Sequence, residues 1–343
     1  MSPRHDIQPG RPLDIDDLLS LSWGWRPALM MLEAHKAGIF DAAAGGWKSA
    51  GQIAIAIGGD ERATGLLMLG LCGAGLMEKS GDSFRNAPAV ERHLVKASPH
   101  YRGYALELDR RAVSNWSRIA EVVQSGQPIP KPEATEEHKN AWQETFIRAM
   151  DNLASAAVEP LLAAMPLADG QRLLDIGCGP AKYLVEILRR NKASTAVGFD
   201  RPNSEKVVSA AASKAGVEER LVFRGGDFTV DSFAQDGPFD GILISQVIHI
   251  MGDDQAEGLV RRAAAALAPG GFMAIHEMTL GPESDPGPAA IFAVQMMLGT
   301  AEGKVYSEAE LAAMMERAGL SMVSSSRTDE RSRIIVALKK GPD

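Results

Sequence analysis

The chain has 343 residues, of which 45% are hydrophobic and 23% are charged, with a formal net charge of -8 and a pI near 5.5. This length allows two domains with large buried cores. The acidic balance disfavours a nucleic-acid partner, because phosphate backbones select basic surfaces, and it favours a small-molecule substrate.

Cysteine usage and the amino terminus indicate a compartment. Cys72 and Cys178 show neither a disulfide framework nor metal-ligand spacing, which favours a reducing environment. Residues 1–11 are polar and contain prolines, so no signal peptide is predicted. No apolar run reaches the roughly 20 residues of a membrane span. We therefore expect a cytoplasmic protein with no metal and no membrane partner.

The amino-terminal third reads as helices followed by a hairpin. Apolar residues recur at helical spacing over residues 18–44, and further helices are predicted over 50–57 and 61–72. Residues 75–86 predict two short strands around a turn at 80–82. This order is typical of a winged helix, but the helix that would read DNA is mostly apolar, which disfavours that role. Large apolar side chains gathered near the start predict a homodimer interface: Trp23, Trp25, Leu29, Met30 and Leu32.

The middle of the chain predicts a loop and a long helix. Residues 125–137 are rich in proline and charge and read as a linker. A helix is expected over about 137–165, with a kink at Pro160. Trp142, Phe146 and Met150 recur every four residues and share one face. Such a stripe is most often ordinary core packing.

Strands and helices alternate from residue 171 onward. Apolar strand-like runs occur at 172–176, 195–199, 221–223, 241–245, 272–275 and 334–338, with the clearest helices at 181–190 and 255–267. Alternation of this kind predicts an α/β fold with a doubly wound, Rossmann-like, mostly parallel sheet. The runs 321–325 and 333–338 predict an antiparallel pair at its edge.

Residues 173–179, Leu-Leu-Asp-Ile-Gly-Cys-Gly, predict a strand that turns through two glycines into a helix. This arrangement places bare backbone and a helix amino terminus at the carboxyl edge of the sheet. Gly177 and Gly179 allow a ligand to approach the backbone closely. Lys182 stands where a dinucleotide fingerprint needs its third glycine, which disfavours a nicotinamide oxidoreductase. The carboxylate of Asp175 suits a cofactor with an amine and a sulfonium.

Acids also end the next two strands. Asp200 is placed to accept hydrogen bonds from ribose hydroxyls. Gly226, Asp227 and Phe228 follow the third strand, where the acid suits the adenine amine and the ring suits stacking. Either acid alone reads better as a helix cap or turn residue. Their convergence with the glycine turn at one sheet edge favours cofactor binding.

The glycine turn resembles the first motif of class I S-adenosylmethionine-dependent methyltransferases. From about residue 15 to 338 the chain resembles the two-domain small-molecule O-methyltransferases, most closely at 28–30, 38–41, 66–69 and 75–76. The resemblance implies a winged-helix-like dimerisation domain (1–115), linking helices (116–168) and a methyltransferase domain (169–343). It implies S-adenosylmethionine as cofactor, with the family's cofactor positions falling on Gly177, Asp200, Asp227, Phe228 and Ser245.

The same resemblance implies an acceptor site. The stripe of Trp142, Phe146 and Met150 would line it, and residues 289–300, with Met296 and Met297, are expected to shape it. His249 aligns with the family's general base, although Met251 replaces a tryptophan of that motif. An imidazole titrates near neutral pH and can take a proton from a hydroxyl. Plant members orient this histidine with glutamates, one at the position of Val305; the residues of this chain that could substitute are Glu302, Glu277 and His276.

Methyl transfer to a hydroxyl of a small, natural-product-like aromatic molecule is therefore the leading functional prediction. The alternatives within enzymes are transfer to nitrogen or carbon, and a non-methylating reaction that uses the same cofactor. A ligand-sensing regulator that binds DNA through the winged helix belongs to a different class. Its phosphate contacts would show a steep salt dependence in a DNA-binding assay.

Overall fold

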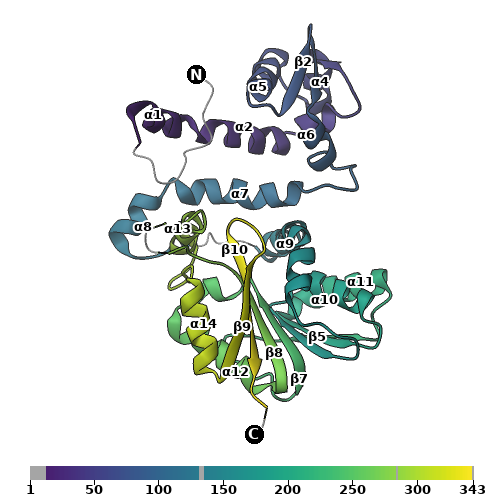
Figure 1. Ribbon diagram of the computed structural model, residues 1–343. Helices are drawn as coiled ribbons and strands as arrows, with labels where there is room; N and C mark the ends of the chain where they lie inside the picture. Colours follow the sequence, from purple (N-terminus) through teal and green to yellow (C-terminus); the bar gives the residue numbers. More distant parts are fainter. Residues whose placement is uncertain (1–12, 131–134, 283–284, 342–343) are drawn as a thin grey trace. The chain divides into compact units, whose positions relative to one another are not determined.

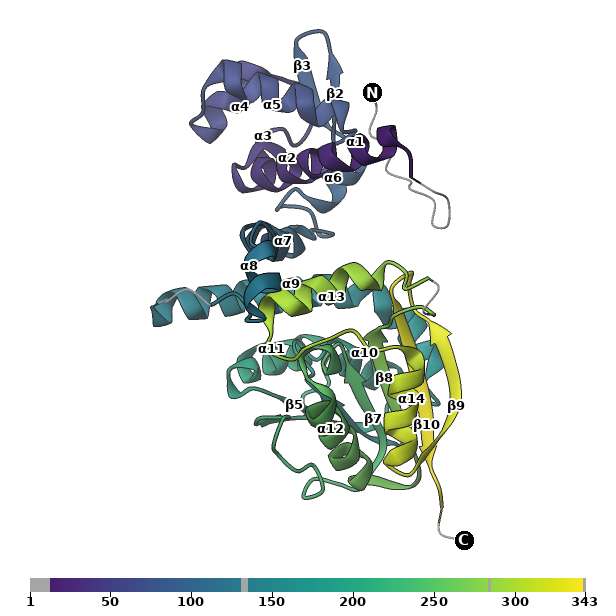
Figure 2. The ribbon, with the colours of Figure 1, turned by 90° about the vertical axis from the view of Figure 1, so that its left-hand side faces the viewer.

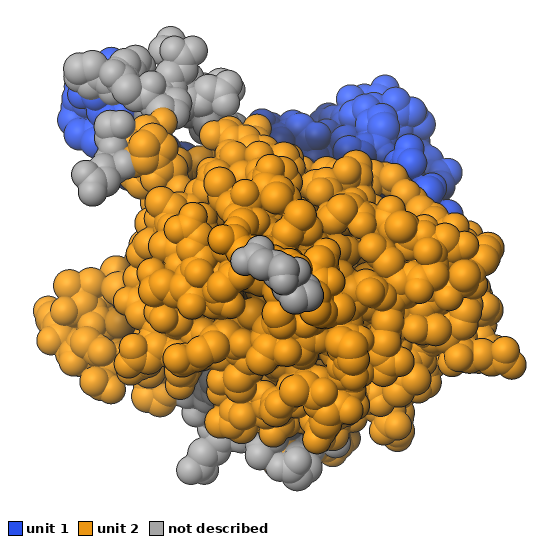
Figure 3. Space-filling model, turned by 60° about the horizontal axis from the view of Figure 1, so that its bottom comes forward, with its two compact units in different colours: residues 1–114 blue, residues 115–343 orange. Residues whose placement is uncertain are grey.

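The computed structural model describes residues 13–130, 135–282 and 285–341. The chain divides into two compact units, residues 1–114 and 115–343, coloured separately in Figure 3. The polar segment 1–11 lies outside the described residues, as does part of the linker predicted at 125–137. The finer division at residues 115 and 168 stays a prediction, and residues 116–168 cluster with the second unit.

The first unit is mainly helical and carries a small antiparallel sheet of order β1-β3-β2. Its helices are α1 (Ile15–Trp23), α2 (Trp25–Lys36), α3 (Ile39–Ala42), α4 (Ala50–Ile57), α5 (Glu61–Gly73) and α6 (Pro88–His93). Its strands are β1 (Lys48–Ser49), β2 (Met77–Ser80) and β3 (Ser83–Asn86). Helix α7 (Gly103–Trp116) begins in this unit. The predicted helices and hairpin are found here.

Local sequence explains where these helices begin and end. Ser49 and Gln52 form a reciprocal capping box that starts α4, since each side chain accepts from the other's backbone N–H. The apolar run 18–44, predicted as one pattern, is divided into α1, α2 and α3. Gly38 separates α2 from α3 with a φ of 79°, a left-handed conformation that glycine adopts without strain. The buried core includes Phe40, Ile53, Met68, Leu71 and Phe84.

The second unit is built on a sheet whose order, within the described ranges, is β6-β5-β4-β7-β8-β10-β9. The strands are β4 (Arg172–Ile176), β5 (Thr195–Asp200), β6 (Leu221–Gly225), β7 (Phe239–Ser245), β8 (Leu267–Met278), β9 (Leu320–Arg327) and β10 (Ser332–Lys339). The first five run parallel, and β10 pairs antiparallel with both β8 and β9. This arrangement confirms the predicted doubly wound sheet and its antiparallel edge pair.

Helices cover both faces of this sheet (Figures 1 and 2). The helices of the second unit are α8 (Ile119–Ser125), α9 (Glu136–Ala164), α10 (Lys182–Arg190), α11 (Glu205–Ala215), α12 (Asp253–Ala265), α13 (Ala289–Gly299) and α14 (Glu308–Arg317), with short 3-10 helices η1 (Pro202–Ser204) and η2 (Ile248–Ile250). Helix α9 continues through Pro160 to Ala164. None of the helices in the described part is long and apolar enough to cross a membrane.

Two apolar cores lie on opposite faces of the sheet. Leu173, Leu243 and Ala274 pack with α9, α10 and α11, whereas Leu174, Ile244 and Ile275 pack with α12 and α14. Because successive strand residues point to opposite faces, this register also sorts the polar residues at the carboxyl edge. Asp175, Ser245 and His276 belong to the α10 face, and Glu277 belongs to the α12 face.

Candidate active site

The glycine turn after β4 is packed tightly against neighbouring strands. The backbone N–H groups of Gly177 and Cys178 both donate to the carbonyl of Phe199, over 2.8 and 3.2 Å. Gly177 has a φ of 77°, and a Cβ there would lie 2.4 Å from Cγ2 of Val247. Gly179 also has a positive φ, of 52°, but a Cβ there would meet no atom within 4 Å. Only Gly177 therefore requires glycine for space as well as for conformation.

Asp175, two residues before this turn, is a buried carboxylate without a hydrogen-bond donor. The residue is 1% exposed, and neither carboxylate oxygen accepts a hydrogen bond from the described residues. Burial, followed by the negative charge of Asp200, raises the pKa of Asp175 to about 8. Buried polar groups are nearly always paired, because an unpaired one costs free energy. Such a group is suited to a donor or cation that a ligand brings.

Asp200, the last residue of β5, stabilises the glycine turn through hydrogen bonds. Its Oδ2 accepts from the backbone N–H of Gly179 over 2.7 Å, and its Oδ1 accepts from the N–H of Arg201 over 2.6 Å. Register places Asp200 on the same face of the sheet as Asp175, one strand away. A carboxylate has about four acceptor positions, so Asp200 retains capacity for ligand hydroxyls.

The segment after β6 has a local structural role as well. The N–H of Gly226 donates to the carbonyl of Asp200 over 2.9 Å. Asp227 is exposed, and its Oδ1 accepts from the hydroxyl and N–H of Thr229, which lowers the pKa of Asp227. Phe228 is 8% exposed and packs in the α12-face core, which leaves little ring surface for stacking. The hydrogen bonds that Asp227 makes within the chain are therefore those of a turn residue, the alternative role given for this acid in the sequence analysis.

Ser245, at the end of β7, belongs to a buried polar chain. Its hydroxyl lies 2.9 Å from Nδ1 of His276 and also hydrogen-bonds the hydroxyl of Tyr183. The other ring nitrogen of His276 lies 2.9 Å from the hydroxyl of Thr328. Burial lowers the pKa of His276, so its ring stays neutral and can donate through one nitrogen only. Sequence reasoning identified Ser245 but not the partners that hold it.

His249 lies in η2, directly after β7, and is paired with a glutamate. Its Nδ1 lies 2.8 Å from Oε2 of Glu277 on the adjacent strand β8. Glu277 is 1% exposed, and its Oε1 accepts from the N–H groups of Val247 and Ile248 over 2.7 and 2.6 Å. Because a carboxylate accepts only, we assign the proton to Nδ1 of His249, which leaves Nε2 as the acceptor. Phe292 meets the imidazole in a T-shaped contact with the ring centroids 5.0 Å apart.

Val305 occupies the position of the family's orienting glutamate, and three residues were candidates to replace it. Of these, Glu277 is the partner of His249. Val305 is buried, Glu302 lies beside Gly252, and His276 faces the other side of the sheet. One sequence signal would have favoured Glu277. It is an acid at the carboxyl end of a strand next to β7, the same placement that singled out Asp200.

The predicted acceptor residues fall on two helices. On α9, Phe146 is 43% exposed, while Trp142 and Met150 are half-buried. The helix is tied to the sheet edge by the ion pair between Asp151 and Lys182, 2.8 Å long, and by a hydrogen bond from Asn203 to Gln143.

Helix α13 carries Met296, which is 8% exposed, and the half-buried Met297. The same helix contributes Phe292, which sequence reasoning did not single out. The ring contact and the hydrogen bond of His249 reach Phe292 and Glu277. The structure therefore brings α13 directly to the candidate base.

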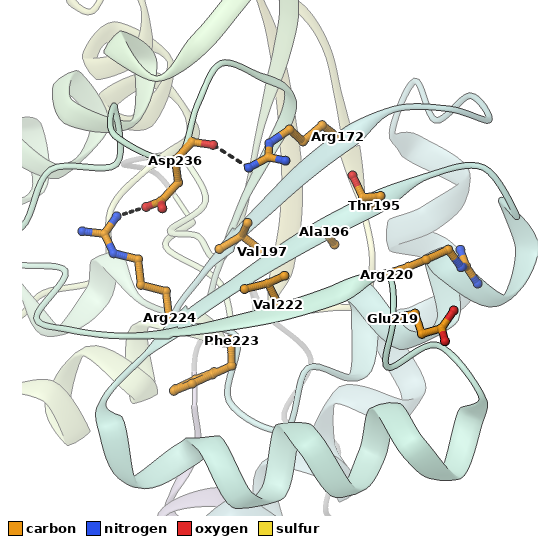
Figure 4. Close-up of a pocket in the computed structure, with 10 residues that line it drawn as sticks. All are labelled: Arg172, Thr195, Ala196, Val197, Glu219, Arg220, Val222, Phe223, Arg224 and Asp236. Atoms are coloured by element: carbon orange, nitrogen blue, oxygen red, sulfur yellow. Dashed lines mark hydrogen bonds and ion pairs between the residues drawn. The ribbon is translucent and has the colours of Figure 1, made fainter.

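A pocket of about 350 Å³ lies away from these residues (Figure 4). It covers β4, β5 and β6, largely toward their amino ends, and none of the predicted site residues lines it. Its arginines are already engaged. Arg172 donates to the carbonyl of Asp236 over 2.8 Å, Arg224 pairs with the Asp236 carboxylate, and Arg220 donates to three backbone carbonyls. This pocket is distinct from the chemistry at the carboxyl edge.

Comparison with known proteins identifies the class. Residues 125–321 match the O-methyltransferase domain family, and this match spans more than half of the chain. The chain belongs to this family of S-adenosylmethionine-dependent methyltransferases, so the enzyme class and cofactor expected from sequence are confirmed.

Individual relatives match most of the chain. A 3-hydroxy-5-methyl-1-naphthoate 3-O-methyltransferase of Streptomyces sahachiroi is 25% identical over 90% of this chain and 90% of its own. An N,N-dimethyltransferase of Streptomyces rimosus is 24% identical over 94% of this chain and 96% of its own. The crystal structure of human N-acetylserotonin methyltransferase in complex with SAM covers 97% of this chain and all of its own, with a TM-score of 0.83 and 21% identity. That likeness confirms the fold.

Proposed function

We propose that this enzyme transfers a methyl group to a hydroxyl of a small aromatic molecule, with His249 as general base. The observation that carries the proposal is the hydrogen bond between Nδ1 of His249 and the buried carboxylate of Glu277. A histidine held by a carboxylate through one nitrogen, and free to accept through the other, is the arrangement of a general base. The naphthoate methyltransferase named above supports an aromatic hydroxyl as acceptor.

The cofactor is proposed to bind along the carboxyl edge of β4, β5, β6 and β7. The residues proposed to hold it are Asp175, Gly177, Gly179, Asp200, Gly226, Asp227, Phe228 and Ser245. Asp175 and Asp200 fit the group, because the unpaired carboxylate of Asp175 suits an ammonium and Asp200 retains acceptor positions for ribose hydroxyls. When bound, S-adenosylmethionine supplies a methyl group made electrophilic by a positively charged sulfur.

The remaining steps are performed by residues of this chain. Nε2 of His249 takes the proton of the acceptor hydroxyl, and Glu277 stabilises the resulting imidazolium across a hydrogen bond of 2.8 Å. Phe292 restricts the imidazole plane. The proposed acceptor-lining residues are Trp142, Phe146, Met150, Met296 and Met297. Side chains of this kind orient an apolar ring and exclude water.

Substitution of His249 by alanine tests this assignment. We expect kcat to fall by about 100-fold to 10,000-fold, the usual contribution of a positioned base. Cofactor affinity, measured by calorimetry, should be nearly unchanged. His100→Ala, which removes an exposed imidazole from the first unit, is the control and should retain full activity. Loss of cofactor binding in a folded His249→Ala variant would contradict the role as base.

Nitrogen is the second candidate acceptor atom, because a relative of similar identity is an N,N-dimethyltransferase. Transfer to carbon and non-methylating use of the cofactor remain further alternatives on this scaffold. Panels of matched phenol and aniline acceptors, analysed by mass spectrometry, separate these possibilities. Methylation of the anilines alone would refute the hydroxyl proposal.

We further propose that the enzyme is a cytoplasmic homodimer that pairs through its first unit. Of the residues predicted for the interface, Trp23 and Trp25 are exposed, Leu29 and Met30 are half-buried, and Leu32 is buried. Helix α1 exposes further large apolar side chains: Ile15, Leu18, Leu19 and Leu21. Exposed clusters of this kind mark interfaces, and two-fold pairing is the commonest solution. The free thiols of Cys72 and Cys178 support a reducing compartment. Sedimentation as a monomer at micromolar concentration would contradict the dimer.

A further inference from the structure

The carboxylate of Asp175 carries an inference that deepens the proposed cofactor site and rests on it. We propose that Asp175 holds a proton in the cofactor-free enzyme and releases it when the cofactor's α-ammonium group binds beside it. Binding is then an exchange of charge, in which one proton leaves to solvent as one cationic ligand enters.

The first support is that the chain provides nothing to stabilise an anion at Asp175. The side chain is 1% exposed, and both oxygens lack a donor among the described residues. The N–H groups of Gly177 and Cys178 in the turn donate to the carbonyl of Phe199 instead. An ionised carboxylate in such a place loses its hydration without compensation, so the neutral acid is favoured.

The second support is the charge of the surroundings on every element packed against Asp175. Strand β5 presents Asp200, a like charge, and this repulsion adds to burial in raising the pKa of Asp175 to about 8. Helix α10 presents the neutral hydroxyl of Tyr183, and its Lys182 is paired with Asp151 of α9 at 2.8 Å. The glycine turn presents the thiol of Cys178, whose pKa burial raises well above its ordinary value.

The same α10 face of β7 and β8 presents Ser245 and His276, and the ring of His276 is kept neutral by burial. The described elements around Asp175 therefore contribute no unpaired cation. The ligand class proposed for this edge does contribute one, because its α-amino group is protonated at neutral pH. An opposite charge within a few ångströms favours the ionised carboxylate.

Proton exchange has a sign that can be measured. Below pH 8 the free enzyme must lose a proton to bind, so the apparent dissociation constant should rise about tenfold for each unit that the pH falls, until the proton stays bound in the complex as well. Above that pH the dependence should flatten.

Calorimetry provides a readout that does not depend on turnover. The full-length enzyme is titrated at pH 7 with S-adenosylhomocysteine, in phosphate and in Tris, whose ionisation enthalpies differ. The difference in observed enthalpy gives the number of protons exchanged. We expect release of about one proton per site. 5′-Methylthioadenosine, which lacks the amino-acid portion, should bind without proton release.

Two carboxyl-to-amide variants complete the test. Asp175→Asn reproduces the shape of the protonated acid, so it should fold, bind S-adenosylhomocysteine more weakly and release no proton. Glu159→Gln alters a carboxylate that is 74% exposed and paired with Arg190, and it should release the proton as the unaltered enzyme does.

Binding of S-adenosylhomocysteine without proton release would overturn the exchange. Undiminished release from Asp175→Asn would also overturn it, because the proton would then come from another group. Failure of the unaltered enzyme to bind S-adenosylhomocysteine at all would instead refute the proposed cofactor site, so the two failures are distinguishable.

Discussion

Two buried carboxylates at the same edge of the sheet differ in the hydrogen bonds that they accept. Glu277 and Asp175 are each 1% exposed. Glu277 accepts three hydrogen bonds, from two backbone N–H groups and from His249. Asp175 accepts none from the described residues and lies near the like charge of Asp200. At β7 and β8 the buried acid is fully paired within the chain, whereas at β4 the buried acid has no hydrogen-bond donor among the described residues.

The roles proposed for these two parts of the edge account for this difference. A general base has to be in place before the acceptor arrives, so its partner is preorganised and desolvated. A binding site gains affinity when the ligand satisfies groups that the protein leaves unsatisfied. Four substitutions test the contrast, from the largest expected effect to the smallest.

The largest effect should come from Glu277→Gln. The amide nitrogen cannot accept from Nδ1 of His249, and a neutral side chain cannot stabilise an imidazolium. We expect kcat to fall about 100-fold to 10,000-fold, with little change in the calorimetric Kd for S-adenosylhomocysteine. Glu302→Gln, the matched control at the other acid near this loop, should change kcat little. Equal losses in both variants would show that Glu277 has no special role.

Asp175→Asn should alter how stability depends on pH. The folded-state pKa of Asp175 lies above the ordinary value of 3.8, at about 8, so the folded protein holds the proton more tightly than the unfolded chain. The resulting stability is fully present below about pH 4 and is lost as the pH rises to about 8, by about 1.4 kcal/mol per unit. In urea unfolding without cofactor, the free energy of unfolding of the variant should rise relative to that of the unaltered enzyme as the pH increases from about 4 to about 8. Parallel profiles would contradict the prediction.

Gly177→Ala tests the packing between the glycine turn after β4 and Val247, which follows β7. Its new methyl group would press on Val247, whose N–H is bound by Glu277, and its φ of 77° disfavours any side chain. We expect a loss of about 2–4 kcal/mol from strain and overpacking. Gly179→Ala, with a positive φ but free space, should cost only about 1–2 kcal/mol. Denaturant titrations compare them, and equal losses would exclude a contribution from Val247.

The smallest effect should come from Lys182→Ala. Its ion pair with Asp151 joins α10 to α9, but the two side chains are 33% and 43% exposed. Partly exposed pairs of this kind contribute about 0.2–1 kcal/mol, and salt screens them. A double-mutant cycle with Asp151→Ala, measured at low and high salt, gives the coupling energy. A coupling energy above about 2 kcal/mol would contradict the prediction, because it would be typical of a buried ion pair and not of a partly exposed one.

The architecture was predictable because its signals are local and periodic. Strand β4 and helix α4 have the bounds that alternation and helical spacing predicted, and the glycine turn lies between β4 and α10 as expected. Helices α7, α11 and α14 were not singled out by the spacing of their apolar residues. The cofactor and enzyme class followed from the motif and its resemblance.

The pairings within the site could not be read in the same way. The partner of His249 could have been Glu302, Glu277 or His276. The choice depends on strand register and on the face that each residue occupies, and neither can be derived from residue spacing alone. The partners of Ser245 are Tyr183 of α10 and His276 of β8, and His276 in turn meets Thr328 in the turn after β9, so the chain joins residues far apart in sequence. The role of Asp227 in its own turn was a stated alternative, and only the bonds to Thr229 make it visible.

Helix α10 begins with an unusual residue, and this start bears on the rigidity of the glycine turn. Ala181, fully buried at its N-cap, has a φ of 55°, a left-handed conformation that costs an alanine roughly 1 kcal/mol or more. A residue in such a conformation persists only where the surrounding structure over-determines it, so the packing around the buried Ala181 fixes this part of the backbone. The loop is thereby held in one shape, and a ligand that meets it does not have to order it first.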